Sequence, residues 1–144
     1  MKKTIFIICT VRNAPLEYEA YVRNLEAQGH KVHLPHRDTN QDQRGFDICI
    51  DNADHIILSD EIHIFYNSES QGTHFDMGGV FMFNMLVHMG IVPIPQKKIV
   101  VVKNEPFDHK EGPAFARMLH EWSQDTTPTP VYKVPQEVKI RNDM

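Results

Sequence analysis

Hydrophobic residues along this chain come in two patterns that alternate as far as about residue 125. Short continuous runs rich in Ile and Val are typical of strands buried on both faces of a parallel sheet. Longer segments with an apolar residue every three or four positions are typical of amphipathic helices. The expected strands are Thr4–Cys9, Lys31–Pro35, Glu61–Tyr66 and Lys98–Lys103, and the expected helices are Leu16–Gln28, Asp42–Ser59, Asp76 to about Met89, and Gly112–Gln124.

Strands that alternate with helices predict an α/β domain, in which an open parallel sheet of four to five strands has helices on both faces. We expect this three-layer domain to span residues 1–125. Residues 126–144 are rich in Pro and polar side chains, so we expect a loose tail there. Within that tail, Val131–Val134 is a candidate for one extra strand.

Three loops carry most of the polar functional groups. They are Thr10–Pro15, His36–Gln41 and Asn67–Asp76, and each follows an expected strand. Ligands of open parallel sheets bind outside the carboxyl ends of the strands. The three loops therefore predict one composite pocket, which Cys9, His36 and Asn67 border at the strand ends.

The segment Ser70–Asp76 is the most informative of these. A Ser and a Gly just before a helix can hold an anion on backbone N–H groups, so Ser70 and Gly72 are candidate phosphate ligands. We expect Asp76 in the first turn of the helix, on the rim of the same pocket. Phosphate site and carboxylate together suggest a site for a phosphorylated sugar. A second interpretation stays open, in which Ser70 and Gly72 are ordinary turn residues and Asp76 complements the helix dipole.

Arg12, in the first loop, has two interpretations as well: a phosphate clamp, or a solvated surface side chain. Three histidines recur at every third position, but they straddle a turn and a strand and cannot share one face, which disfavours a metal site. These histidines are His30, His33 and His36.

Composition and motifs narrow the function classes. The net charge is −4 and no run of five basic residues occurs, which argues against a nucleic-acid-binding surface. No apolar run approaches the roughly 20 residues of a membrane span, and the apolar N-terminal stretch is short for a signal peptide. Cys9 and Cys49 form no metal or redox motif, so we expect a cytoplasmic protein with reduced thiols. Dinucleotide-binding and P-loop motifs do not occur.

Four places in the chain resemble the nucleoside 2-deoxyribosyltransferase family, including its branch of deoxynucleoside 5′-monophosphate N-glycosidases. They are Ile-Ile-Cys-x-Val-Arg-Asn in the first loop, Asp60 before the third strand, Ser70-x-Gly72, and Phe75-Asp76-Met77-Gly78. The resemblance covers roughly residues 4–104. The family nucleophile is a Glu, and the matching residue here is Asp76. The family also uses an Asp on the helix before the third strand, where Asn52 stands at the matching spacing with Asp51 beside it.

The resemblance implies a flavodoxin-like (Rossmann-like) fold, a homodimer or larger assembly, and no metal or organic cofactor. It implies that Ser70, Gly72 and the first loop, with Thr10, Arg12 and Asn13, bind a 5′-phosphate. The implied reaction is N-glycosidic cleavage or deoxyribosyl transfer on a nucleoside or nucleoside 5′-monophosphate. In that reaction the carboxylate of the nucleophile attacks C1′ of the sugar, as in retaining glycosidases.

Two alternative functions stay open. The substitutions at Asp76 and Asn52 favour a nucleotide-binding protein that has lost catalysis. An Asp arm is about 1.5 Å shorter than a Glu arm, and a misplacement of about 1 Å can cost roughly 10²-fold in rate. The other alternative is a hydrolase that uses the same carboxylate chemistry on NAD or ADP-ribose-like ligands.

Overall fold

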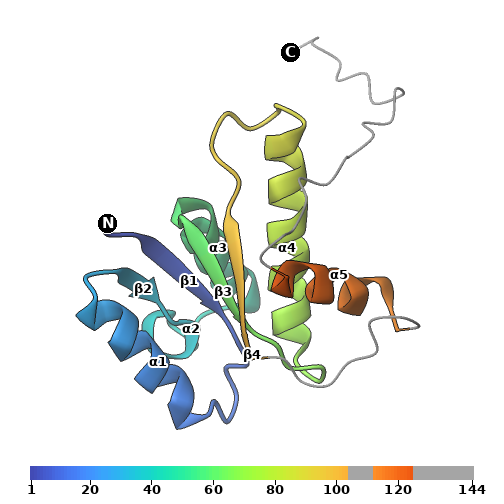
Figure 1. Cartoon of the computed structure of the whole chain (residues 1–144). Helices are drawn as coiled ribbons and strands as arrows, with labels where there is room; N and C mark the ends of the chain where they lie inside the picture. The colour runs from blue at the N-terminus through green and yellow to red at the C-terminus, as the bar shows by residue number, and fades with distance from the viewer. Residues whose placement is uncertain (104–111, 125–144) are drawn as a thin grey trace.

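Four parallel strands form the centre of the molecule (Figure 1). The computed structural model describes residues 1–103 and 112–124. Within these ranges the strands pair in the order β2-β1-β3-β4, so β1 and β3 are the central pair. Their bounds are β1 Thr4–Ile8, β2 Lys31–His33, β3 Glu61–Phe65 and β4 Lys98–Lys103.

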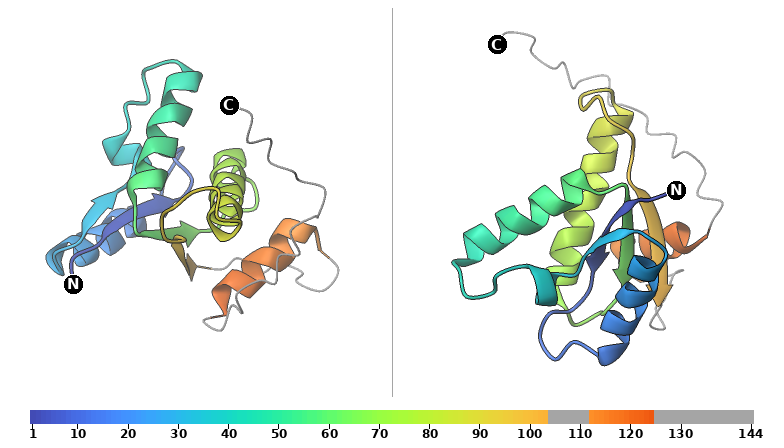
Figure 2. Two further views of the ribbon diagram at one scale, coloured as in Figure 1. Left: turned by 90° about the horizontal axis from the view of Figure 1, so that it is seen from above. Right: turned by 90° about the vertical axis from the view of Figure 1, so that its left-hand side faces the viewer.

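Helices cover both faces of this sheet. Helix α1 lies on one face, and α3, α4 and α5 lie on the other, as the two views of Figure 2 show. A fifth helix, α2, is a single turn after β2. The bounds are α1 Leu16–Ala27, α2 Pro35–Asp38, α3 Gly45–Leu58, α4 Gln71–His88 and α5 Ala114–Ser123. The predicted three-layer α/β fold with a parallel sheet is confirmed, with four strands in the described residues.

Strand β1 supplies both hydrophobic cores because successive side chains of a strand point to opposite faces. Ile5 and Ile7 pack with α1, whereas Phe6 and Ile8 pack with α3, α4 and α5. All four side chains are at most 1% exposed. Full burial of such a side chain contributes about 1.5–3 kcal/mol, which explains why the apolar runs mark the strands so clearly in the sequence.

Two predicted element boundaries are wrong in a way that bears on function. The expected loop after β2 begins with helix α2, since Pro35 opens the turn and the Asp38 carboxylate accepts a hydrogen bond from the Leu34 N–H at 2.8 Å. Helix α4 begins at Gln71, five residues before the expected start at Asp76. Asp76 therefore lies in the second turn of α4 and not in the first.

The remaining boundaries match the expected ones or differ by at most three residues, as helix and strand ends commonly do. The expected tail at 126–144 and its candidate strand lie outside the described residues. Among the described helices, none is long and apolar enough to cross a membrane. The expected homodimer stays a prediction, and the surface to test for it is a set of exposed apolar side chains on α3 and α4: Phe46, Ile50, Ile57, Phe75 and Met82.

Candidate active site

A cleft of about 730 Å³ lies at the carboxyl ends of the central strands. In the strand order β2-β1-β3-β4, the chain leaves β1 and β3 in opposite directions, and ligands of such sheets bind at this switch point. The walls of the cleft come from the loop after β1, the segment from α2 to α3, and the loop after β3 with the start of α4. The sequence-predicted residues that line it are Cys9, Thr10, Arg12, Asn52, Asn67, Ser70, Gly72 and Asp76.

One end of the cleft is suited to an anion. Ser70 is the N-cap of α4, and its hydroxyl accepts a hydrogen bond from the Thr73 N–H at 3.2 Å. A helix N-terminus attracts negative charge through its free N–H groups and its dipole. A Cβ added at Gly72 would meet no protein atom within 4 Å, so the space in front of this first turn is open. Arg12 lines the same cleft, and its guanidinium has no ion pair among the described residues.

Hydrogen bonds between residues two positions apart shape the two loops that carry these groups. The Thr10 hydroxyl donates to the Arg12 carbonyl at 3.3 Å, and Asn13 turns the chain with a left-handed φ of 51°. The Asn67 side chain accepts from the Glu69 N–H at 2.9 Å, which directs the loop into the cap of α4. Thr10 and Asn67 thus hold loop geometry as well as lining the cleft.

Asp76 lies on the floor of the cleft as a half-buried carboxylate. It makes no hydrogen bond or ion pair with any described residue. Burial raises the pKa of Asp76 from 3.8 to about 7, because desolvation disfavours the charged form and no partner compensates. A carboxylate with a pKa near neutrality, in a cleft beside a helix N-terminus, is a candidate for acid, base or nucleophile.

Cys9 borders Asp76, and its buried thiol is poorly suited to act as a nucleophile. Its thiol is 5% exposed, and burial raises its pKa to about 12, with a smaller contribution from the negative charge of Asp76. The thiolate, which is the reactive form, is therefore not populated near neutral pH. Cys9 therefore forms part of the wall of the cleft.

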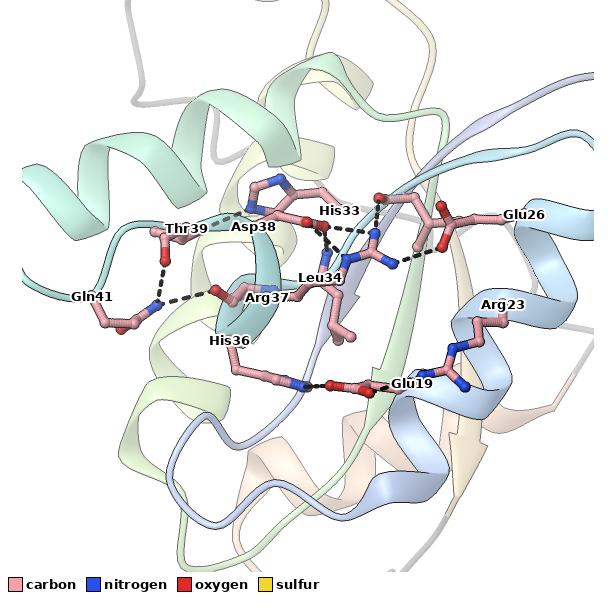
Figure 3. A network of polar contacts seen from close by, with 12 residues as sticks. Glu19, Arg23, Glu26, His33, Leu34, His36, Arg37, Asp38, Thr39 and Gln41 are labelled. Carbon is pink, nitrogen blue, oxygen red and sulfur yellow. Dashed lines mark hydrogen bonds and ion pairs between the residues drawn. The ribbon is translucent and has the colours of Figure 1, made fainter.

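Three predicted site residues do not line the cleft. The His36 ring points to α1, with its Nε2 atom 3.5 Å from a Glu19 carboxylate oxygen (Figure 3). The carboxylate of Asp51 accepts a hydrogen bond from the Gln43 side chain at 2.6 Å. Asn13 is exposed outside the cleft. Of the two candidates for an acid partner, only Asn52 lines the cleft with Asp76.

Sequence reasoning missed several lining residues. Gln41 lines the cleft from the predicted loop His36–Gln41, but no feature of the sequence distinguishes it there. Glu69 and Gln71 line the cleft on either side of the Ser70 cap. Phe75 lines the cleft and is 67% exposed, which a helical pattern cannot reveal. The sequence signal for Glu69, Gln71 and Phe75 is their position next to Ser70 or Asp76, and the signal for Gln41 is its place in the predicted loop.

Two further hollows adjoin α4. An apolar groove of about 290 Å³ between α3 and α4 meets the cleft at Cys49, Phe75 and Asp76. A cavity of about 720 Å³ separates α4 from α5 and includes His74 and Phe115. In residues 1–103 and 112–124, no group of three His, Cys, Asp or Glu residues is placed to hold a metal ion.

Comparison with known proteins bears on the fold. No protein-family model and no curated protein matches this chain. A solved structure of 2-deoxyribosyltransferase from the psychrotolerant bacterium Bacillus psychrosaccharolyticus is similar, with a TM-score of 0.51 and 16% sequence identity. The match covers 73% of this chain and 77% of that one. At this identity the similarity shows a shared flavodoxin-like α/β fold, and the site chemistry has to be argued from this chain's own residues.

Proposed function

We propose that this protein cleaves or transfers the N-glycosidic bond of a nucleoside 5′-monophosphate, with Asp76 as the carboxylate nucleophile. The observation that carries the proposal is that one cleft holds the carboxylate of Asp76, the first turn of α4 and Arg12. Neither Asp76 nor Arg12 has an ion pair within residues 1–103 and 112–124. The fold it shares with a 2-deoxyribosyltransferase and the four sequence resemblances support the same reaction class.

Distance along α4 suits this chemistry. From the Ser70 cap to Asp76 the helix rises about 9 Å, at about 1.5 Å per residue. A phosphate at the cap and a sugar carbon at the carboxylate are therefore separated by about the length of a ribose 5′-phosphate. The opening at Gly72 leaves room for this ligand along the helix.

The reaction balances without a redox partner. An Asp76 oxygen bonds to C1′ as the C1′–N bond breaks, and the bond's electron pair leaves with the base, which takes a proton from solvent. Water, or a second base, then displaces the carboxylate from C1′ and completes hydrolysis or transfer. Only the ionised carboxylate can attack, so a pKa of about 7 makes the reaction dependent on pH around neutrality.

A second candidate function is nucleotide binding without turnover. Asn52 favours this candidate. It lines the cleft together with Asp76, and its amide group cannot give up a proton to a leaving base. In this case the cleft would sequester a nucleotide, and binding would be measurable while base release would not.

The deciding experiment incubates purified protein with a panel of nucleosides, their 5′-monophosphates and NAD, and measures free base by chromatography. We expect base release from a 5′-monophosphate and none from the same reaction with Asp76→Ala. The control variant is Asp54→Asn, which changes an exposed carboxylate on α3 outside the cleft. Equal release by native protein and Asp76→Ala refutes the proposal, and calorimetric binding with no release from any substrate favours the second candidate.

A further inference from the structure

We propose that His74 is a positioning residue, which orients the peptide between Ser70 and Gln71 so that the Gln71 N–H group points at the phosphate of the ligand. This inference rests on the proposed function, since it assigns a role at the phosphate end of the same cleft. His74 lines the cavity between α4 and α5 and not the cleft itself. It therefore acts on the ligand through the backbone of Ser70, which its ring contacts.

Two groups of His74 meet the Ser70 carbonyl oxygen. The ring Nδ1 atom lies 2.7 Å from that oxygen, and the backbone N–H of His74 donates to it at 3.3 Å. The ring is thus the closer of the two donors. A carbonyl oxygen can only accept a hydrogen bond, so the Nδ1 atom must carry a proton.

The other side of the His74 ring is held by residues outside α4. The Tyr66 hydroxyl, just beyond β3, lies 3.2 Å from the Nε2 atom. In the neutral ring a proton on Nδ1 leaves Nε2 as an acceptor, so the Tyr66 hydroxyl donates to it. The rings of Tyr66 and of Phe115 on α5 stand nearly perpendicular to the His74 ring, with centroids 5.4 Å and 4.9 Å away, as favoured aromatic pairs do. The orientation of the ring is therefore set from two further parts of the fold.

A fixed Ser70 carbonyl also fixes the N–H group that follows it. The peptide bond between Ser70 and Gln71 is planar and trans, so the Gln71 N–H points in the opposite direction to the Ser70 C=O. The carbonyl points along α4 to His74, and the N–H therefore points out of the helix N-terminus. Gln71 lines the cleft, and its N–H donates to no residue within 1–103 and 112–124.

This arrangement matters for a phosphate because few N–H groups of the first turn are left for a ligand. The Thr73 N–H already donates to the Ser70 hydroxyl at 3.2 Å, which leaves those of Gln71 and Gly72. A donor whose direction is set before binding loses less conformational freedom when the ligand arrives. Loss of the His74 ring should therefore weaken ligands that carry a phosphate and leave the others unchanged.

The first test reads the tautomer of His74 by ¹⁵N NMR of the full chain at pH 8. We expect a proton on Nδ1, in a signal that is lost in His74→Leu. A ring without a proton on Nδ1 cannot donate to the Ser70 carbonyl and overturns the proposal. This measurement needs no ligand and no activity.

The second test titrates ¹⁵N-labelled protein with 2-deoxyribose 5-phosphate and, separately, with 2-deoxyribose. We expect the phosphate probe to shift the Gln71 amide signal, and its affinity to fall about tenfold in His74→Leu, which corresponds to one hydrogen bond of about 1.4 kcal/mol. Binding of 2-deoxyribose should not change. The matched variant is His74→Asn, whose Nδ2 atom is as far along the side chain as the histidine Nδ1, and we expect it to keep the native affinity.

The order of the two variants separates positioning from helix stability. Leu is a better helix former than Asn, so a general loss of helix stability would make His74→Asn the weaker binder. Circular dichroism checks that each variant folds. Equal affinities of the two variants, equal losses for both probes, or a Gln71 amide signal that the phosphate probe does not move in the native protein overturn the positioning role.

The two proposals fail separately. The expected pattern of binding without base release from any substrate contradicts glycosidic cleavage and supports the role of His74. Base release that Asp76→Ala abolishes, together with a Gln71 amide signal that does not move, supports glycosidic cleavage and overturns the role of His74.

Discussion

Two acidic side chains at opposite ends of β3 show how burial acts on a carboxylate with and without partners. Glu61 stands at the amino end, where its carboxylate is 2.8 Å from the His63 Nε2 atom and forms an ion pair with Lys3. Asp76 stands beyond the carboxyl end and has neither kind of partner among the described residues. Burial alone would raise both pKa values.

The partners reverse the outcome for Glu61. Burial is the largest single influence and raises its pKa, but hydrogen bonds from His63 and Lys3 and their charges outweigh it, so the pKa is lowered. His63 is itself fixed by the Tyr21 hydroxyl at 2.7 Å. The side chains of this cluster bond to one another, which makes it a structural element. The pKa of Asp76 is raised to about 7 because nothing opposes its burial, and this leaves a group available to a ligand.

The largest expected effect is on activity. Asp76→Asn should lower base release by at least about 10³-fold, since the amide cannot form the glycosyl ester. Glu61→Gln should leave kcat within a fewfold of the native value, because its cluster is at the other end of β3. Initial rates with the 5′-monophosphate identified by the substrate panel check both. Loss of activity in Glu61→Gln with native folding would break the comparison.

For the free energy of unfolding, we expect the larger effect from Glu61→Gln and the smaller one from Asp76→Asn. Glu61→Gln removes the charge that Lys3 and His63 face, and we expect the free energy of unfolding to fall by about 2 kcal/mol. Asp76→Asn should show no such loss. Urea denaturation followed by circular dichroism measures both, with the exposed Asp54→Asn as the matched control. A Glu61→Gln midpoint equal to that of the control would show that the cluster contributes nothing.

The raised pKa of Asp76 should make the stability of the protein depend on pH. The folded-state pKa of Asp76 is about 7 and the unfolded value is near 3.9, so the folded state holds the proton more tightly between these values. Its stabilising contribution is complete below about pH 4 and is lost as the pH rises through 7. Asp76→Asn should therefore gain stability over the native protein by about 1–2 kcal/mol at pH 8, and by much less at pH 4.

A thermal melting series from pH 4 to pH 8 checks this prediction. Base release by the native protein should rise over the same range, with half of its maximum near pH 7. A difference between native protein and Asp76→Asn that is independent of pH would mean that the carboxyl is not desolvated.

A smaller effect is expected for Arg12. Arg12→Gln should weaken binding of a 5′-monophosphate about tenfold relative to the unphosphorylated nucleoside, because it removes one charge-assisted contact. The matched control is Arg23→Gln, whose side chain pairs with Glu19 on the surface of α1. Competition binding at two salt concentrations measures the difference. An equal loss for nucleoside and nucleotide would remove Arg12 from the phosphate site.

The smallest effect on folding is expected for Gly72→Ala. The added Cβ meets no protein atom, and φ at this position is not left-handed, so stability should change by less than about 0.5 kcal/mol. Nucleotide affinity should fall nevertheless, because the methyl group enters the space before the first turn of α4. Thermal melting and calorimetry on the same sample check the two parts. Unchanged affinity would place the phosphate elsewhere.

Local patterns explain how much of this protein could be predicted. The apolar runs of β1, β3 and β4 and the helical spacing of α1 and α5 were enough for the fold, since burial on both faces of a sheet leaves an uninterrupted hydrophobic signal. The same reasoning placed Ser70 and Asp76 at one pocket. This reasoning failed at the start of α4. The Ser70 cap begins the helix at Gln71, and the first residues of the helix do not have the regular spacing of apolar side chains that predicts a helix.

Tertiary structure alone decided which polar residues meet. His36 and Asp51 looked as suitable as Asn52, but neighbours on α1 and the α2–α3 loop occupy them, and only Asn52 reaches the cleft. The sequence by itself determined which segments form buried strands, and that Asp76 follows the Ser70–Gly72 turn at the start of a helix. Partner choice, and with it the raised pKa of Asp76, depends on contacts between residues far apart in the chain, which no local pattern encodes.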